Sequence, residues 1–353
     1  RAYAGDFSLN NAKKGIDFLH KHSKKAFITL NIYPFTDEYN KMLQIAGQLS
    51  EMGADAFIVA DIGLIFEMKK AGIKTPLHIS TQANTLSSQT VLAYHQLGAK
   101  RINLARELSF EQIRQIRKDT LNSGIELEVF IHGAVCFSYS GRCAISDYLT
   151  ARRANHGQCT HPCRWKYSLV EEKRPNEYFP VFEDDRGQYL FNSKDLALFE
   201  YVEPLMEIGV DSFKIEGRMK SVHYIASAVS LYRQLIDGKK ISKDEAMRLL
   251  SRVKNRGYSS GFMKGSIVQD DYSIAKSETL SYAVFTGDIA DEETADGCIC
   301  HVRNKIFGGE KLEVLTPTGE IFEITLPKTL KNIQGESLEF ANNPQKILIA
   351  QKL

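Results

Sequence analysis

The chain has 353 residues, of which 43% are hydrophobic and 25% are charged, and its formal net charge is +2. This composition is ordinary for a globular protein and excludes low-complexity chains. No apolar run approaches the roughly 18–20 residues that span a bilayer, so the sequence predicts no membrane segment. No basic-then-apolar leader opens the chain, and we expect a cytoplasmic protein. Because the chain begins at Arg1 within RAYAGDF, we also expect that the start of the natural protein is missing.

Helical and strand-like patterns alternate over the first two thirds of the chain. The expected strands are 26–34, 56–61, 76–82, 101–106 and 127–133, and the expected helices are 11–22, 37–53, 62–72, 87–98 and 110–124, the last capped by Ser109. Further on, 189–209 and 211–221 each repeat a strand followed by a helix. The strands are continuous apolar runs, which is typical of a parallel sheet buried on both faces.

This alternation predicts a TIM-like (β/α)8 barrel that lacks its first βα unit in this chain. About seven strands occur up to residue 216, so one unit lost before Arg1 would complete the eight. A doubly wound open sheet is the alternative, although no glycine-rich dinucleotide fingerprint follows any strand.

Two domains are expected. The barrel domain would cover 1–265, with an insertion at 134–190 that holds four cysteines and a hairpin formed by WKYSLVEEK and YFPVFEDD. Short strands between turns at TGD, GGE, PTGE and QGE predict a small all-β barrel domain over 276–353. Cys298 and Cys300 lie in one of these strands, and we expect them to be core or surface residues rather than ligands.

Polar side chains follow nearly every expected strand, at the end where barrel enzymes place their chemistry. A single such residue is more simply explained by a loop hydrogen bond or an ion pair, but together they favour a real pocket. The candidate catalytic residues are Glu128, His132, His78 and Glu216, and the candidate substrate-binding residues are Gln82, Arg106, Glu107, Arg142, Asp195, Lys214 and Arg218.

Two stretches contain several positive charges. In KIEGR, Lys214, Glu216 and Arg218 alternate and would share one face of a strand, where they could pair internally or hold an anionic substrate. The second stretch, 142–166, has five Arg or Lys residues and one acid, Asp147. It is either a solvated loop or a surface for phosphate groups.

Four cysteines fall within 28 residues, at Cys136, Cys143, Cys159 and Cys163. Short loops of this kind can bring four thiolates round one metal centre. The spacing is looser than structural zinc sites prefer, which favours an iron–sulfur cluster without excluding zinc. A thiol nucleophile is the other alternative, because His132 precedes Cys136 by four residues.

The stretch EVFIHGAVCFSYSGRCAIS resembles the signature of the collagenase-like peptidase family of unassigned catalytic mechanism, as do HISTQAN, LARELS, NSKDL and KIEGRMKS. The resemblance covers the chain to about residue 265. Members of this family include proteases, proteins that hydroxylate the wobble uridine of tRNA or a cytidine of rRNA, and proteins that assist the hydroxylation of ubiquinone precursors.

The resemblance implies a 4Fe–4S cluster on Cys136, Cys143, Cys159 and, where the family's last spacing is three residues, Cys163. It also implies prephenate as the oxygen source, with Lys214 and Arg218 suited to that dicarboxylate and the basic stretch 142–166 suited to RNA. A peptidase is the alternative function, and hydroxylation of a quinone precursor, which would require an apolar pocket and a second family subunit, is a further one.

Overall fold

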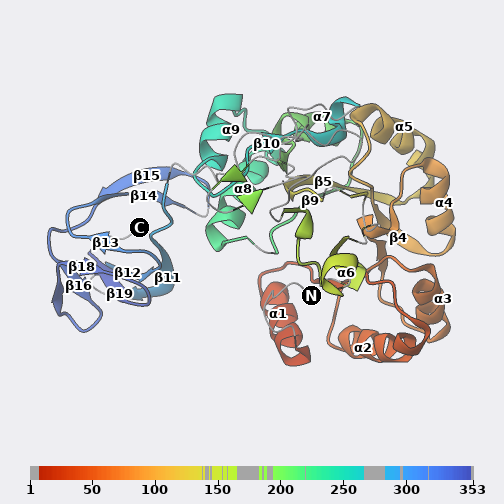
Figure 1. Cartoon of the computed structure of the whole chain (residues 1–353), viewed down its shortest axis with the longest axis horizontal. Coiled ribbons are helices and arrows are strands. Elements are labelled where there is room, and N and C mark those ends of the chain that lie inside the picture. Colours follow the sequence, from red (N-terminus) through yellow and green to blue (C-terminus); the bar gives the residue numbers. More distant parts are fainter. Residues whose placement is uncertain are drawn as a thin grey trace, which may run out of the picture. The chain divides into compact units, whose positions relative to one another are not determined.

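The computed structural model describes residues 8–136, 138–139, 143, 145–152, 154–156, 158–164, 183–184, 187–188, 194–218, 220–265, 283–294, 297–316 and 318–350. By their internal contacts, these residues divide into two compact units, which are drawn in Figure 1. The first comprises 1–219 and 256–278, and the second 220–255 and 279–353. The domain boundaries expected from the sequence remain a prediction.

The first unit is a mixed α/β structure around one sheet, as the sequence predicts. Its strands are β1 (Phe27–Leu30), β2 (Ala56–Val59), β3 (Leu77–Ile79), β4 (Ala99–Asn103), β5 (Glu126–Ala134), β8 (Asp195–Ala197), β9 (Ser212–Ile215) and β10 (Tyr258–Ser259). β1 to β5 are parallel and paired in chain order, and β9 joins the edge of β5 in parallel. The pairings form a path from β1 to β10, and closure into a barrel stays a prediction.

One strand departs from the all-parallel expectation. β8 pairs antiparallel with the end of β5 and parallel with β10. β5 has nine residues, so its first part pairs with β4 and its last part with β8, while β9 takes its other edge. A long strand can therefore serve three neighbours, which short strand patterns in a sequence do not reveal.

Helices α1 (Leu9–Lys21), α2 (Tyr39–Glu51), α3 (Ile62–Lys70), α4 (Ser88–Gln96), α5 (Phe110–Thr120), α6 (Ile145–Thr150) and α7 (Val202–Glu207) belong to the same unit. Figure 1 shows α2 to α5 side by side along one side of it. Ser109 caps α5 as predicted, because its hydroxyl accepts from the backbone N–H of Gln112 while the Gln112 side chain accepts from the N–H of Ser109. The expected hairpin lies largely outside the described residues, apart from β6 (Glu183–Asp184), which pairs with β7 (Gly187–Gln188).

The second unit contains α8 (Val222–Ile236) and α9 (Lys243–Leu250) together with antiparallel β-sheets, which confirms the expected all-β structure towards the C-terminus. Its largest sheet joins β11 (Gly287–Thr294), β12 (Gly297–Val302), β19 (Lys346–Ile349), β16 (Leu330–Asn332) and β17 (Ser337–Leu338). Two further pairs are β13 (Ile306–Phe307) with β18 (Phe340–Ala341) and β14 (Lys311–Leu315) with β15 (Ile321–Thr325).

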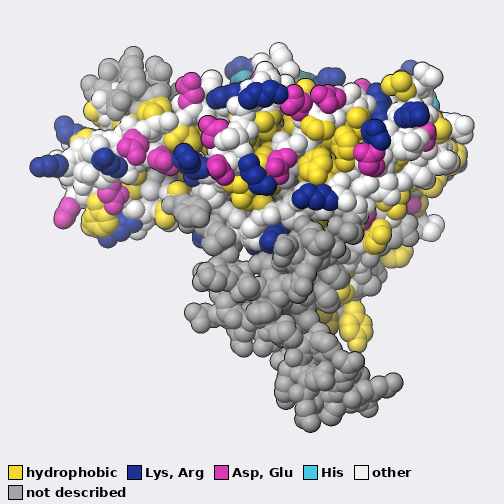
Figure 2. Space-filling view, turned by 90° about the horizontal axis from the view of Figure 1, so that it is seen from above, with side chains coloured by type: hydrophobic (Ala, Val, Ile, Leu, Met, Phe, Trp, Pro, Cys, Tyr) yellow, Lys and Arg dark blue, Asp and Glu magenta, His cyan; other side chains and the backbone are white. Residues whose placement is uncertain are grey.

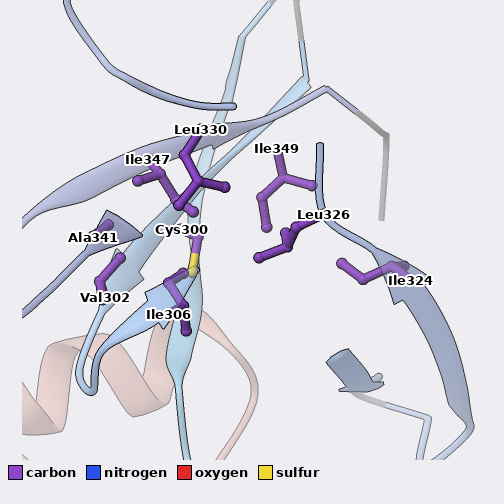
Figure 3. Packing of buried hydrophobic residues seen from close by; sticks show 9 residues of the cluster. All are labelled: Cys300, Val302, Ile306, Ile324, Leu326, Leu330, Ala341, Ile347 and Ile349. Carbon is purple, nitrogen blue, oxygen red and sulfur yellow. The ribbon is translucent and has the colours of Figure 1, made fainter. Parts of the chain in front are cut away.

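Buried side chains of the second unit, most of them aliphatic, form a hydrophobic core. Figure 3 shows the sulfur of Cys300 among Val302, Ile306 and Ile347. Cys298 is buried as well. Burial raises the pKa of the Cys300 thiol to about 11, so this cysteine is a neutral packing residue at physiological pH. The sequence allowed these two cysteines to be either core or surface residues, and the structure shows that both are core residues. In neither unit do the described residues include a helix of the length and apolarity that a membrane crossing requires.

Candidate functional site

Across β1 to β5, the sheet of the first unit has one apolar face and one face that carries polar side chains. Paired residues in neighbouring parallel strands point to the same face, and consecutive residues in a strand point to opposite faces. One row across the sheet is Leu30, Val59, Ile79, Ile102 and Leu127, all buried. The row before it on the other face is Thr29, Ile58, His78, Arg101 and Glu126. The strands are therefore not apolar on both faces, and the polar face is the candidate site.

Glu128 is at the centre of this face. Its carboxylate accepts from Asn103 Nδ2 at 3.0 Å and from Ser212 Oγ at 2.8 Å. Arg101 Nη1 lies 3.4 Å from Oε2 and Lys214 Nζ lies 3.5 Å from Oε1. Only 10% of the Glu128 side chain is exposed, so two cations and two hydrogen bonds stabilise a carboxylate that is almost fully buried.

Strand register explains why these groups meet. Asn103 on β4 pairs with Glu128 on β5, and Glu128 pairs with Ser212 on β9. Arg101, two residues before Asn103, reaches both Glu128 and Glu126, with its Nε 2.7 Å from Glu126 Oε2. Glu128 is the third residue of a nine-residue strand, so it lies well before the strand end where the sequence placed it.

His78 on β3 is buried beside this network and is neutral. Burial, and after it the charge of the nearby Arg101, lower its pKa to about 4, while Glu128 and Glu126 act in the opposite direction. Its ring packs edge-on against Phe27 with centroids 4.8 Å apart, and the Arg101 guanidinium lies 5.3 Å from the same Phe27 ring. A neutral imidazole can accept a proton or donate a hydrogen bond, so His78 can act as a base here but holds no charge at neutral pH.

Two predicted substrate-binding cations meet at one aromatic ring. Lys214 Nζ lies 5.4 Å from the centre of the Phe130 ring, and the guanidinium carbon of Arg106 lies 6.0 Å from it. Lys214 thus contacts both Glu128 and Phe130, and part of its charge is already balanced by the carboxylate. Glu107 follows Arg106 in the turn after β4 and is half-buried.

Another part of the predicted site lies where β5 and β9 end. The backbone N–H of Glu216 donates to the carbonyl of His132 at 2.9 Å. The Glu216 carboxylate accepts from the backbone N–H of Arg218 at 2.9 Å, so it orders its own loop, and Arg218 is exposed. His132 is buried, with its ring 5.6 Å from that of Tyr258. Lys214 faces Glu128 instead, so the three KIEGR residues do not act as one cluster.

Asp195 and Gln82 have mainly structural contacts. Asp195 is completely buried, and its Oδ1 lies 2.6 Å from Arg256 Nη2, which is the geometry of an internal ion pair. Gln82 lies in the short helix Thr81–Ala83, where its backbone carbonyl accepts from Tyr33 at 2.5 Å. Its Oε1 atom is buried and has no hydrogen-bond partner within the described part of the chain. Arg142 lies outside the described residues.

The cysteine-bearing insertion begins directly after β5. Cys136 is exposed, Cys143, Cys159 and Cys163 are half-buried, and none of the four forms a disulfide. The backbone N–H of Thr160 donates to Ser146 Oγ at 3.2 Å, so the segment after Cys143 lies against the segment that holds Cys159 and Cys163. The donor set suits an iron–sulfur cluster or zinc, since thiolates bind both. Among the residues that the structure describes, no three His, Cys, Asp or Glu side chains converge on a metal position.

The insertion also contacts the segment that follows the first strand. His156, from the short helix Ala154–His156, stacks on Phe35 with ring centroids 5.5 Å apart. Its Nε2 lies 3.4 Å from Glu38 Oε2. Phe35 follows β1, so these contacts bring the cysteine segment to the carboxyl end of the parallel strands.

Sequence reasoning missed Arg101, Asn103, Ser212 and Glu126, which complete the network round Glu128. A signal was available, because Arg101 and Glu126 are charged residues at strand positions that an all-buried sheet would fill with apolar side chains. On the face drawn in Figure 2, positive and negative side chains are interspersed, with hydrophobic side chains between them. The charges of the polar face likewise balance, with Arg101 and Lys214 opposite Glu126 and Glu128.

The fold and the site define an α/β protein with a polar sheet face beside a cysteine-bearing insertion. Residues 1–271 match Peptidase family U32, and residues 282–352 match the Peptidase family U32 C-terminal domain. The chain belongs to this family, which confirms the resemblance noted in the sequence.

Named relatives cover most of the chain. The tRNA hydroxylation protein P of Escherichia coli strain K12 is 34% identical over 97% of this chain and 84% of its own length. The 23S rRNA 5-hydroxycytidine C2501 synthase of the same strain is 35% identical over 65% of this chain and 33% of its own length. Among solved structures, the U32 peptidase Mk0906 is 16% identical with a TM-score of 0.36, covering 60% of this chain and 76% of that one.

Proposed function

We propose that the protein is an RNA-modifying enzyme that hydroxylates a pyrimidine base, with C5 of the tRNA wobble uridine as its target. In this proposal a 4Fe–4S cluster is the cofactor and prephenate is the oxygen donor. The observation that carries it is the 34% identity to a tRNA hydroxylation protein over 97% of the chain. The rRNA hydroxycytidine synthase among the relatives also supports a base in RNA as the substrate.

The proposed reaction balances without a further oxidant. The C5–H bond of the base and a C–OH bond of the donor break, and a C5–OH bond and a C–H bond on the donor carbon form. The base loses two electrons, and the donor carbon gains them. A bound iron–sulfur cluster would supply one-electron transfer, and the residues to hold it are Cys136, Cys143, Cys159 and Cys163.

The polar face supplies the remaining groups. Glu128 pairs with Arg101 and Lys214, and His78 is neutral, so the two provide an acidic group fixed by its ion pairs and a nearby proton acceptor. Arg218 is exposed beyond β9 and can contact one carboxylate of the donor. Lys214 is the proposed second contact, although the donor would then share it with Glu128.

The first experiment is anaerobic purification with iron and sulfide counts and an absorption spectrum. We expect a brown protein that loses its iron in the Cys136→Ala and Cys159→Ala variants. Cys298→Ala is the matched control, because that thiol is buried in the β-sheet unit and should leave the iron count unchanged. A colourless preparation with one zinc or no metal would contradict the cluster.

The second experiment measures the product. Nucleosides from the tRNA of cells that lack the gene should lose the hydroxylated uridine, and wild-type protein should restore it. A Lys214→Met and Arg218→Met double variant should not restore it. If the double variant restores hydroxylation fully, those two residues do not bind the oxygen donor.

A peptidase is the second candidate, which the name of the matched family favours. The same anaerobic preparation can be assayed on gelatin and on labelled peptides. Peptide cleavage that disappears in the Cys136→Ala or His132→Gln variant, with normal tRNA nucleosides in the deletion strain, would replace the hydroxylase proposal. A quinone-precursor hydroxylase would instead leave the tRNA unchanged and lower the ubiquinone content of the deletion strain.

A further inference from the structure

Three aromatic side chains are exposed at or beside the cysteine-bearing insertion. Tyr148 on α6 is 88% exposed, Tyr139 is 55% exposed and Phe35 is 49% exposed. Large aromatic side chains contribute much of the binding free energy of interfaces when they are buried there. Exposed aromatic side chains that lie close together therefore indicate a binding surface. Tyr148 projects from a helix of only six residues, so it does not complete the apolar stripe of a longer amphipathic helix.

Contacts link the segments that hold Tyr148 and Phe35, and Tyr139 lies between Cys136 and Cys143 in the same insertion. Thr150 and Ser146 of α6 hydrogen-bond to Thr160, which anchors the helix that holds Tyr148 to the segment between Cys159 and Cys163. The same insertion reaches Phe35 through the stacked ring of His156. Two of the aromatic side chains therefore lie on the segment proposed to hold the cofactor, and Phe35 lies in the segment after β1 that the insertion contacts.

The charge of the insertion indicates the partner. Residues 142–166 include five Arg or Lys side chains and one acid, Asp147, in a chain whose net charge is only +2. Aromatic rings interleaved with cations are the usual surface for single-stranded nucleic acid, because the bases stack on the rings and the cations attract the phosphates. A purely apolar protein partner would not use these cations, and double-stranded RNA offers no unstacked bases.

We propose that Tyr148, with Tyr139 and Phe35, forms a stacking surface for unpaired bases of an RNA loop next to the catalytic site. This inference rests on the proposed function, because it names the surface by which an RNA substrate would be held. It adds that the enzyme recognises a single-stranded loop through base stacking rather than through a duplex.

The test measures binding of the full-length protein to two fluorescently labelled RNAs, a 17-nucleotide anticodon stem-loop and a fully paired hairpin of the same length. We expect Tyr148→Ala to raise the Kd for the stem-loop about 5- to 100-fold, which corresponds to the loss of one stacked base. Tyr148→Phe should bind like the wild type, because it keeps the ring. Phe18→Ala is the matched control, since Phe18 is 63% exposed on α1, which precedes the amino end of β1.

Each outcome supports or overturns the proposal. Selective loss of stem-loop binding in Tyr148→Ala, with Tyr148→Phe and Phe18→Ala unchanged, supports it. If the wild type binds the stem-loop and Tyr148→Ala binds it equally well, the stacking surface is wrong while the proposed function stands. If Tyr148→Ala changes the oligomeric mass but not RNA binding, the surface is a protein interface. If wild-type protein neither binds nor modifies RNA, the proposed function itself fails.

Discussion

Gly133 and Glu216 lie so close at the ends of β5 and β9 that no side chain fits between them. A Cβ atom on Gly133 would lie 2.5 Å from the backbone oxygen of Glu216, and Gly133 has a φ of +121°. This is a conformation that side-chain-bearing residues rarely adopt, next to a backbone contact that cannot move cheaply. The glycine therefore fixes how the strand that leads to the cysteines leaves the sheet.

Gly133→Ala should lower the free energy of unfolding by about 2–4 kcal/mol, because it combines positive-φ strain with a backbone clash. Urea unfolding followed by circular dichroism measures this. Gly47→Ala is the control, because nothing lies within 4 Å of its Cβ position in α2 and alanine is the better helix former. Equal stabilities for the two variants would contradict the close approach.

Glu128→Ala should destabilise the first unit by about 1–3 kcal/mol, because it leaves the half-buried Arg101 and Lys214 without their carboxylate. Glu128→Gln keeps the shape and the hydrogen bond from Ser212 and should cost less. Glu111→Ala serves as the control, since its ion pair with Arg114 is exposed and should change stability by less than about 1 kcal/mol. A similar effect of Glu128→Ala and Glu111→Ala on urea unfolding would show that the network is not buried.

The stability of the protein should rise with pH through His78. Its pKa is about 4 in the folded state against an ordinary value of 6.5, so between these values the unfolded chain binds more protons than the folded one. The His78 contribution is full above about pH 6.5 and is lost as the pH falls towards 4, at up to about 1.4 kcal/mol per pH unit. His78→Gln removes this contribution and should flatten the curve of unfolding free energy between pH 4 and 7. An unchanged slope would show that His78 is not buried neutral.

Asp195 and Arg256 should behave as a structural pair. Arg256→Met alone leaves the buried Asp195 without this cation and should cost about 3–5 kcal/mol, and Asp195→Asn alone leaves the half-buried Arg256 without its carboxylate. The double variant should cost clearly less than the sum, because no charge is then left unpaired. Urea unfolding of the three variants measures this coupling. Additive costs would argue against the pair and return Asp195 to the candidate substrate-binding residues.

Alkylation should separate the two groups of cysteines. In metal-free folded protein, iodoacetamide should modify the exposed Cys136 well before Cys300, whose thiol is buried with a pKa of about 11. Mass spectrometry of tryptic peptides follows both sites. In metal-loaded protein, the bound metal should protect Cys136 from alkylation if this residue is a ligand. Cys300 should react only after unfolding. Rapid modification of Cys300 in folded protein would contradict its burial.

Local patterns were enough to determine several features. The alternation of helix and strand, the Ser109 cap and the all-β character of the C-terminal region follow from residue periodicity and turn residues within a few positions of each other. The clustered cysteines and the motifs that resemble the family are also contiguous in the chain, so the sequence alone displays them. These features depend on neighbours in sequence, and no long-range contact is needed to recognise them.

Only the tertiary structure decided which polar residues meet. Arg101 and Ser212 are 111 positions apart yet lie 3.2 Å from each other beside Glu128, because three parallel strands are in register. Asp195 meets Arg256 across 61 positions, and Lys214 turns to Glu128 instead of joining Glu216 and Arg218. Strand order and register are set by packing of the whole sheet, and a shift of one residue would move each of these side chains to the other face.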